Sequence, residues 1–272
     1  MRRFLLFLFL LSSQAIAEHR PIPRSVRLCE MGLAATLQNR PFSSPFSTWE
    51  GRSSCRSILL CLAESNFTKP SCARYVASAL NSGTGPTVVI DAGHGGNDQG
   101  AKAKNPYCEE KRICLQTARL VKKYLDQLGY HVIMTRNTDA FIPLARRVEI
   151  AKQCDAEIFV SIHFNSSRLP TASGIEIFFY DSQEEKRRTF ASKRLADSIL
   201  TRVLRRTSAH SRGVKKGNLY VTRETSMPAV LLEGGFISNP GERANLKALD
   251  YQEKIARGVA DGVDHYFKKL KR

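Results

Sequence analysis

Several short motifs that would assign this chain to a common enzyme class are absent from its sequence. No Ser-x-x-Lys occurs anywhere, which argues against a penicillin-type serine enzyme. The seven cysteines include no Cys-x-x-Cys or zinc-ribbon spacing, so we do not interpret them as metal ligands. Internal repeats and low-complexity runs are also lacking, which excludes a repeat array.

The N-terminus has the three parts of a secretory signal peptide. Arg2 and Arg3 form a basic region, an apolar run extends from Phe4 to Leu11, and Ala15-Ile16-Ala17 has the small-residue pattern of a signal peptidase site. The apolar run is too short to span a bilayer. We therefore expect residues 1–17 to be removed on export, and we expect the mature protein to have no transmembrane span. It would then be located in the periplasm, in the cell wall or in the medium.

Acidic residues are few compared with basic ones. The chain has 42 Lys and Arg against 25 Asp and Glu, a net charge of +17. A surplus of this size indicates an anionic partner. Nucleic acid would be the usual partner inside a cell, but anionic polymers or lipids of the envelope fit an exported protein better, and we expect no nucleic-acid partner. A basic surface that only faces solvent is the alternative.

Residues 18–84 differ from the rest of the chain. Four of the cysteines lie here, at Cys29, Cys55, Cys61 and Cys72, and export would permit three different pairings among them. No motif in this segment carries chemistry. It ends in a linker by composition, Asn81 to Pro86. We expect an accessory segment at 18–84 and a catalytic domain at 85–272.

The most informative stretch runs from Thr87 to Gly100. Val88 to Ile90 predict a buried strand that stops at Asp91, and a glycine-rich turn then presents His94. Open α/β sheets bind ligands at the carboxyl ends of their strands. A phosphate-binding loop is an alternative, but the Walker Lys-Ser/Thr ending is missing. A histidine that merely hydrogen-bonds the turn is the other alternative.

Strands and helices alternate along the remaining chain. The patterns predict helices at 109–128, 144–152, 183–206 and 251–270, and strands at 130–135, 156–162, 174–180, 219–222 and 228–232. This alternation predicts an α/β fold with a mostly parallel central sheet flanked by helices. His163 directly follows one of these strands and Glu233 follows another.

Two histidines and a carboxylate are the usual ligands of a catalytic zinc ion, and a further carboxylate can act as general base. His94 and His163 at two strand ends, with Glu233 at a third, could supply such a site. Glu109 or Glu110 could join them from the start of a helix, although acids are favoured there by the helix dipole alone. This reasoning separates neither Glu109 from Glu110 nor the ligand from the base.

Five blocks of sequence, in order, resemble the zinc-dependent N-acetylmuramoyl-L-alanine amidases of the amidase-3 type. The blocks are Val88–Gly100, Glu110-Lys111, Ser161–Asn165, Ser173–Phe178 and Met227–Asn239. The resemblance extends from about Thr87 to the C-terminus. It implies a mostly parallel sheet flanked by helices, and hydrolysis of the amide between N-acetylmuramic acid and L-alanine of peptidoglycan, as in cell-wall remodelling and daughter-cell separation.

The resemblance also implies a role for each candidate residue. His94, Glu110 and His163 would bind one zinc ion, and Glu233 would be the catalytic acid/base. The family ligand is the glutamate directly before lysine, which favours Glu110 over Glu109.

One departure from some family members concerns access to the site. Those members carry an inserted helix that plugs the site, whereas here only one long helix is expected between the second histidine and the last glutamate. We therefore predict an ungated site. Two alternatives remain: a zinc peptidase that cuts within the stem peptide, and a peptidoglycan-binding protein without turnover.

Overall fold

The computed structural model describes residues 85–270. The expected signal peptide at 1–17 and the accessory segment at 18–84, with its four cysteines, lie outside the described residues. Within the described residues, Cys108, Cys114 and Cys154 are free thiols. None of the helices in this part of the chain is both long enough and apolar enough to cross a membrane.

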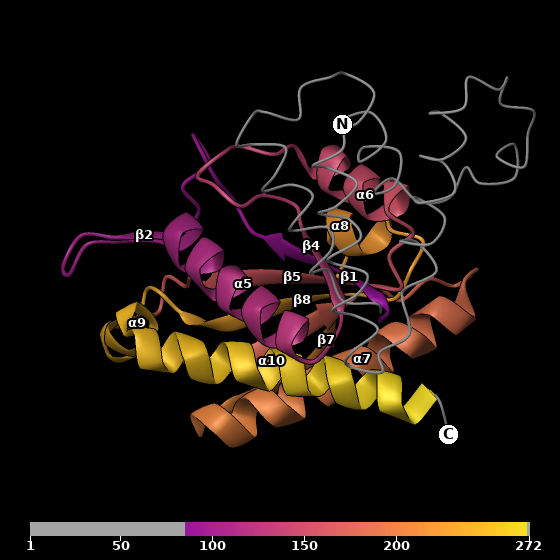
Figure 1. The fold of residues 1–272 in the computed structure, drawn as a ribbon. Helices are drawn as coiled ribbons and strands as arrows, with labels where there is room; N and C mark the ends of the chain where they lie inside the picture. The colour runs from indigo at the N-terminus through magenta and orange to yellow at the C-terminus, as the bar shows by residue number, and fades with distance from the viewer. Residues whose placement is uncertain (1–84, 271–272) are drawn as a thin grey trace, which may run out of the picture. The chain divides into compact units, whose positions relative to one another are not determined.

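A six-stranded sheet forms the centre of the described chain (Figure 1). Its strands follow the spatial order β4 (His131–Met134), β1 (Thr87–Ala92), β5 (Ile158–Asn165), β8 (Ala229–Phe236), β6 (Ile175–Phe179) and β7 (Ser211–Lys216). Neighbouring strands from β4 to β8 are parallel, β6 is antiparallel to β8, and β7 is parallel to β6. The expected mostly parallel sheet flanked by helices is confirmed.

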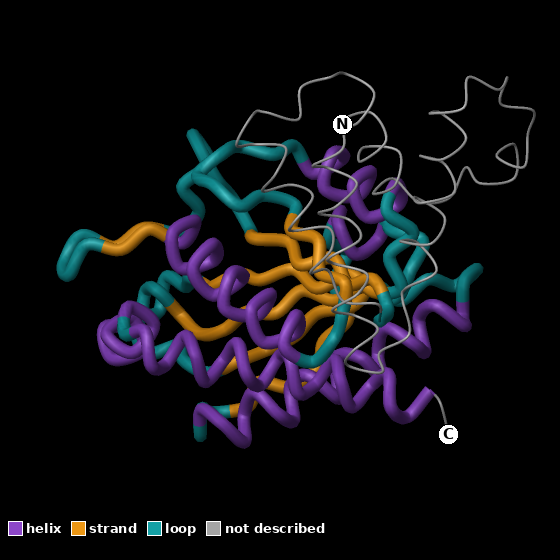
Figure 2. Tube along the Cα trace, in the orientation of Figure 1, coloured by secondary structure: helices purple, strands orange, loops and turns teal. Residues whose placement is uncertain are grey.

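Helices cover both faces of the sheet (Figures 1 and 2). Successive strand residues point to opposite faces, so Val88 and Ile90 enter the larger core while Val89 enters a smaller one. The larger core is closed by α5 (Glu110–Gln127), α7 (Lys186–Thr207) and α10 (Leu249–Leu270). The smaller core is closed by α6 (Leu144–Gln153) and α8 (Tyr220–Arg223).

Two glycines allow α10 to lie very close to α7. A Cβ atom on Gly258 would stand 2.6 Å from the Cα of Val203, and one on Gly262 would stand 2.5 Å from the Cα of Ile199. Real Cβ atoms do not approach other atoms so closely, so the two backbones could not pack at this distance with larger residues. This close contact holds α7 and α10 together on the sheet face that carries the larger core.

One expected element is wrong and several were not expected. The predicted strand at 219–222 is instead the single helical turn α8, in which Arg223 N–H donates to the Leu219 carbonyl at 2.9 Å. Val221 and Thr222 are buried because the turn packs on the smaller sheet face. The unexpected elements are β7, α9 (Pro240–Lys247), and the small hairpin of β2 (Lys102–Ala103) and β3 (Cys108–Glu109).

Candidate metal centre

The loop after β1 presents His94 in a left-handed backbone conformation, with φ of +58°. This conformation is uncommon for a residue with a side chain, and it turns the imidazole toward the start of α5. Nδ1 of His94 lies 2.8 Å from a carboxylate oxygen of Asp98, and Nε2 lies 2.9 Å from Oε1 of Glu110. Asp98 therefore orients the ring, leaving Nε2 to face the site.

Glu110 is the first residue of α5, and its carboxylate is buried with partners at both oxygens. Oε1 accepts a hydrogen bond from the Phe164 backbone N–H at 3.1 Å, and Oε2 accepts one from the Ala101 N–H at 2.8 Å. The neighbouring Glu109 is turned away and accepts hydrogen bonds from Tyr107 and Arg112. The structure thus brings Glu110, and not Glu109, to the histidines.

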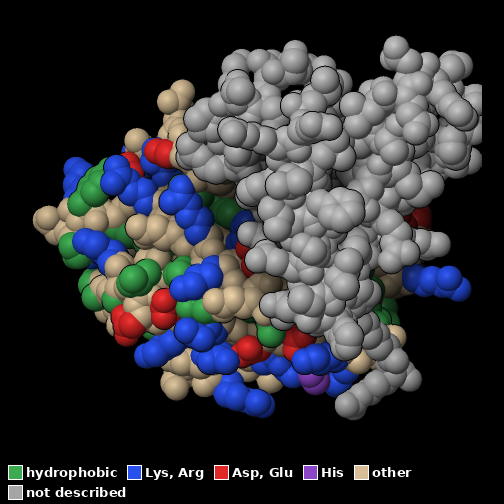
Figure 3. Space-filling model, in the orientation of Figure 1, with side chains coloured by type: hydrophobic (Ala, Val, Ile, Leu, Met, Phe, Trp, Pro, Cys, Tyr) green, Lys and Arg blue, Asp and Glu red, His purple; other side chains and the backbone are tan. Residues whose placement is uncertain are grey.

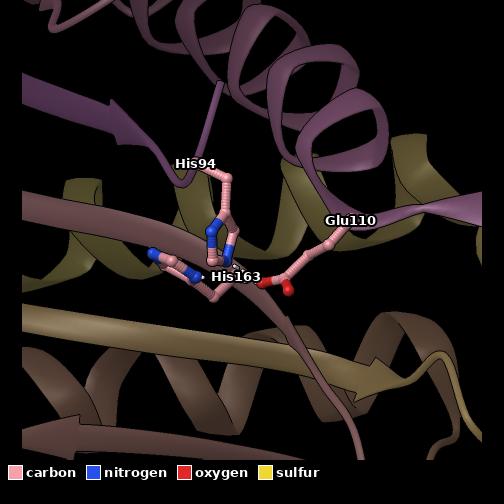
Figure 4. Close-up of side chains that lie close together, drawn as sticks. All are labelled: His94, Glu110 and His163. Carbon is pink, nitrogen blue, oxygen red and sulfur yellow. Dashed lines mark hydrogen bonds and ion pairs between the residues drawn. The ribbon is translucent and has the colours of Figure 1, made fainter. Parts of the chain in front are cut away.

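His163 completes the group from the middle of the sheet (Figure 4). Its Nδ1 lies 2.9 Å from the same Oε1 of Glu110, and its ring meets that of His94 edge to face with centroids 4.7 Å apart. One potential ligand atom from each of the three residues lies within 4.8 Å of the others. The strand was expected to end at Ile162, but β5 continues through His163 to Asn165.

Two glycines leave the room that these side chains occupy. A Cβ atom on Gly93 would stand 2.4 Å from Cε1 and Nε2 of His163. A Cβ atom on Gly100 would stand 2.5 Å from Oε2 of Glu110 and 2.7 Å from the His94 ring. The glycine-rich motif therefore shapes a close-fitting cradle for the three residues, which a phosphate-binding role does not require.

Opposing effects act on the pKa values of the group. Burial of Glu110 would raise its pKa, but hydrogen bonds from His163 and His94 hold the pKa well below the usual range for glutamate. Burial would lower the pKa of His94, but the carboxylates of Glu110 and Asp98 raise it. Glu110 is consequently an anion at neutral pH, as a metal ligand must be.

Behind the His94 loop, a buried ion pair joins the end of β1 to α6. Asp91 accepts hydrogen bonds from Thr135 and Ser161, each at 2.6 Å, and from Arg147 Nη1 at 2.7 Å. Burial alone would raise the pKa of Asp91, but Arg147 and the two hydroxyls keep it below the usual range. Arg147 also donates to the carbonyls of Ala92 and His94 at 2.6 and 2.7 Å.

Two further cations hold the same loop. Arg136 donates to the carbonyls of Ala92 and Gly93 at 2.9 and 2.6 Å. Lys111 Nζ donates to the carbonyl of Gly96 at 2.8 Å and pairs with Asp139 at 2.8 Å. Because the carbonyls of residues 92 to 94 are all held by buried guanidinium groups, the loop has little freedom to move His94 away from Glu110.

Glu233 lies beside the three-residue group, within β8 and opposite His163 in register. Side chains opposite each other on neighbouring strands share a face of the sheet. Among the described residues, Oε2 of Glu233 is a buried atom with no hydrogen-bond partner. Burial and the nearby charges of Glu110 and Glu176 raise the pKa of Glu233 well above the usual range. The protonated form of Glu233 is therefore favoured relative to an ordinary glutamate, which is typical of a carboxyl group that acts as a general acid/base.

The structure thus brings His94, Glu110 and His163 together, with Glu233 on the adjoining strand. Sequence reasoning missed the supporting residues Arg136 and Arg147. Neither residue stands in a motif, and their role depends on loops and helices that meet only in the folded chain.

Comparison with known proteins gives consistent matches. The family model described as N-acetylmuramoyl-L-alanine amidase matches residues 88–265. The uncharacterized protein YqiI of Bacillus subtilis is 38% identical over 183 residues, which cover 67% of this chain and 85% of YqiI. The probable cell wall amidase LytH of Staphylococcus epidermidis is 33% identical over 184 residues, which cover 67% of this chain and 59% of LytH.

Solved structures show the same relationship. The catalytic domain of CwlV, an N-acetylmuramoyl-L-alanine amidase from Bacillus (Paenibacillus) polymyxa var. colistinus, matches with a TM-score of 0.63 and 39% identity over 68% of this chain and 99% of that domain. The N-acetylmuramoyl-L-alanine amidase from Clostridium difficile 630 matches with a TM-score of 0.63 and 34% identity over 67% of this chain and 97% of that chain.

Proposed function

Because this chain belongs to the N-acetylmuramoyl-L-alanine amidase family, we propose that it is an exported zinc hydrolase. It cleaves the amide that joins N-acetylmuramic acid to L-alanine of peptidoglycan, in cell-wall remodelling and daughter-cell separation. The activity class follows from the family. The single observation that carries the residue assignment is the convergence of His94, Glu110 and His163 beside Glu233, whose buried Oε2 has no hydrogen-bond partner among the described residues.

The donor set fits a catalytic zinc ion. Two imidazole nitrogens and one carboxylate oxygen are a known three-ligand set of zinc hydrolases, which leave a further position open. Partners outside the set fix the ligands: Asp98 orients His94, and the Ala101 N–H holds Glu110. Such outer partners orient metal-bound histidines and carboxylates generally. We therefore assign His94, Glu110 and His163 as the ligands of one zinc ion, which when bound supplies Lewis acidity toward the scissile carbonyl.

Glu233 is assigned as the general acid/base. Its raised pKa suits a group that takes a proton from the attacking water and returns it to the leaving nitrogen of L-alanine. The carboxylate lies on the strand next to His163, so it adjoins the place where the carbonyl would bind. General acid–base catalysis of this kind contributes about 10²- to 10⁴-fold to a rate.

The site is ungated in this proposal. Between His163 and Glu233 the chain forms β6, α7, β7 and α8, and α7 is the one helix there longer than a single turn. Its apolar side, including Leu195 and Ile199, packs into the larger core. The long helix of this region therefore belongs to the body of the domain, which supports a site that needs no activator.

Export and attachment to the envelope are further parts of the proposal. The N-terminal pattern of Arg2, Arg3 and the apolar run supports export to the periplasm or cell wall. Lys and Arg side chains are spread over the face shown in Figure 3, with fewer acidic side chains between them. A basic surface of this kind would be attracted to anionic polymers or lipids of the envelope.

Mass spectrometry of the products tests the proposed reaction. Residues 18–272 are incubated with purified peptidoglycan, with and without a zinc chelator. We expect free stem peptides that begin at L-alanine, formed only without the chelator. Peptides cut within the stem would replace the amidase by a stem-peptide peptidase. Absence of any product from the zinc-loaded protein would favour a peptidoglycan-binding protein.

A further inference from the structure

A second buried carboxylate stands next to Glu233 and holds two cations. Glu176 of β6 is the direct register partner of Glu233 across the antiparallel pair with β8, so the two side chains share a face of the sheet. Oε2 of Glu176 accepts hydrogen bonds from Arg212 Nε at 2.8 Å and from Lys215 Nζ at 2.5 Å. Oε1 accepts one from Asn165 Nδ2 at 2.7 Å.

The charges of this cluster do not cancel. One cation would neutralise Glu176, yet both Arg212 and Lys215 pair with it, which leaves one unbalanced positive charge. The side chain of Glu176 is 5% exposed, whereas those of Arg212 and Lys215 are 32% and 39% exposed. The carboxylate is thus enclosed while the two cations keep donors that face solvent.

Both cations are held in place before any ligand binds. The Cζ atom of Arg212 lies over the ring of Phe236, 4.9 Å from the ring centroid. The Nζ atom of Lys215 lies 6.0 Å from the ring centroid of Phe178. Their shared carboxylate fixes them from the buried side. A long side chain that is already ordered loses less entropy on binding an anion, and this strengthens recognition.

The position of the pair matches a particular part of the substrate. β7, which carries both cations, is two strands away from β8 and Glu233. Neighbouring strands are about 4.8 Å apart, so β7 lies roughly 10 Å from β8, and the long side chains of the pair extend back toward β6. Successive residues of a peptide are about 3.8 Å apart. A peptide with its first nitrogen at Glu233 could therefore place its second residue beside Arg212 and Lys215.

We propose that Arg212 and Lys215 bind a carboxylate on the residue that follows L-alanine in the stem peptide. The pair thereby selects substrates in which this group is a free acid over those in which it is an amide. This inference rests on the proposed function and names the substrate class of the same site. Arg and Lys bind a carboxylate by charge-assisted hydrogen bonds, which a neutral carboxamide cannot match.

Two soluble substrates that differ at a single group provide the test. One is N-acetylmuramoyl-L-alanyl-γ-D-glutamyl-L-lysine, and the other carries D-isoglutamine in place of D-glutamate, which converts the α-carboxylate to a carboxamide. We expect the zinc-loaded protein to show kcat/KM about tenfold higher on the acid, since tenfold corresponds to about 1.4 kcal/mol, near the lower limit for a hydrogen bond to a charged group. Lys215→Gln and Arg212→Gln should each bring the ratio toward one, chiefly through KM.

Matched variants separate recognition from damage to the fold. Lys215→Arg keeps the charge and should keep most of the preference for the acid. Lys216→Ala is the control, because Lys216 lies on the same strand but pairs with Asp181 and is 71% exposed. It should leave both rates unchanged. Thermal unfolding of each variant identifies any that is misfolded. If Lys215→Gln is misfolded, the acid-to-amide ratio of kcat/KM is compared between Lys215→Arg and the unmodified protein instead.

Each outcome decides between the two proposals. Equal kcat/KM for the two substrates in the unmodified protein would overturn the inference while leaving the amidase intact. An equal loss on both substrates in Lys215→Gln would also overturn it, since the pair would then act through Glu233 or the fold. If the unmodified protein releases neither peptide but remains folded and zinc-loaded, the proposed function itself fails.

Discussion

Glu110 and Glu233, the two acids of the site, occupy contrasting surroundings. Around Glu110, two backbone N–H groups and two imidazoles surround the carboxylate, and its pKa is lowered. Around Glu233, the buried Oε2 has no hydrogen-bond partner within residues 85–270, and the pKa of this side chain is raised. The fold therefore stabilises the anionic form of Glu110 and the protonated form of Glu233. Both residues are glutamates, so the difference comes from their surroundings. It supports the assignment of Glu110 as the metal ligand and of Glu233 as the general base.

The strongest test of this contrast is to remove the charge of Glu110. Glu110→Gln turns an NH₂ group toward backbone donors or toward the histidines, so the proposed zinc site loses an anionic ligand. Loss of an outer partner costs about 10- to 100-fold in metal affinity, and loss of a ligand should exceed about 100-fold. Zinc content after dialysis against a competing chelator measures the effect.

Glu149→Gln is the matched control for this substitution. Glu149 lies on α6, is 52% exposed and pairs with Arg146. It should retain zinc and activity. If Glu110→Gln also retained zinc, the assignment of Glu110 as a ligand would be wrong.

Glu233→Gln should separate catalysis from metal binding. We expect kcat to fall by about 10²- to 10⁴-fold, the usual contribution of a general acid/base, while the zinc content stays that of the unmodified protein. The measurement is product release from the soluble muramoyl peptides, together with metal analysis of the same sample. Loss of zinc from this variant would show that the ligand and the base have been exchanged in our assignment.

A smaller loss of zinc affinity is expected from a substitution that crowds the ligand His163 without changing any charge. Gly93→Ala places a methyl group 2.4 Å from ring atoms of His163, so the ring must move away from Glu110. Displacement of a ligand should weaken zinc binding by about 10- to 100-fold, comparable to loss of an outer partner. Competition with a chelator measures it, and Gly241→Ala, where the nearest atom is 3.4 Å away, is the control. Unchanged zinc affinity in Gly93→Ala would mean that the His163 ring has room to shift without losing its position as a ligand.

The smallest expected effect is on the pH dependence of stability in the metal-free protein. The folded-state pKa of Glu233 is raised above the usual value of 4.5, so the folded state binds this proton more tightly than the unfolded state. The contribution of Glu233 to stability therefore falls as the pH rises from 4.5 toward the folded-state pKa of this group. Glu233→Gln removes this loss, and its stability relative to the unmodified protein should increase with pH, by at most about 1.4 kcal/mol per pH unit.

Urea unfolding at several pH values, with metal removed from both proteins, gives this difference directly. A stability difference that does not change with pH would mean that Glu233 titrates normally in the fold. The contrast with Glu110 would then rest on hydrogen bonds alone.

Most residues of the proposed zinc site could be predicted from the sequence, because they stand next to strand or glycine-turn patterns that are recognisable locally. His94 follows a β-branched run and stands among glycines, and His163 and Glu233 follow the apolar residues of buried strands. Parallel strands bring their carboxyl ends to one edge, so these residues were expected to meet. The roles of Glu110 and Glu233 came from family resemblance, since only the folded surroundings distinguish them physically.

Other elements could not be predicted, for identifiable reasons. Strand β7 carries Arg212, Lys215 and Lys216 and shows no regular alternation of apolar residues, so its strand structure depends on pairing with β6. The α8 turn contains β-branched Val221 and Thr222, which favour strands locally, but packing on the sheet overrides this tendency. Helix α9 had a usable signal: Asn239 caps it by accepting from the N–H of Gly241 at 3.0 Å, and proline follows the cap.

The composition of β7 also affects the behaviour of the protein in concentrated solution. Among the described residues, β7 is an edge of the sheet, and an edge strand can recruit a strand from another molecule and start aggregation. Arg212, Lys215 and Lys216 place three positive charges on its six residues. A second copy that approached this edge with the same strand would meet like charges. The strand that holds the proposed carboxylate-binding pair thus also opposes self-association.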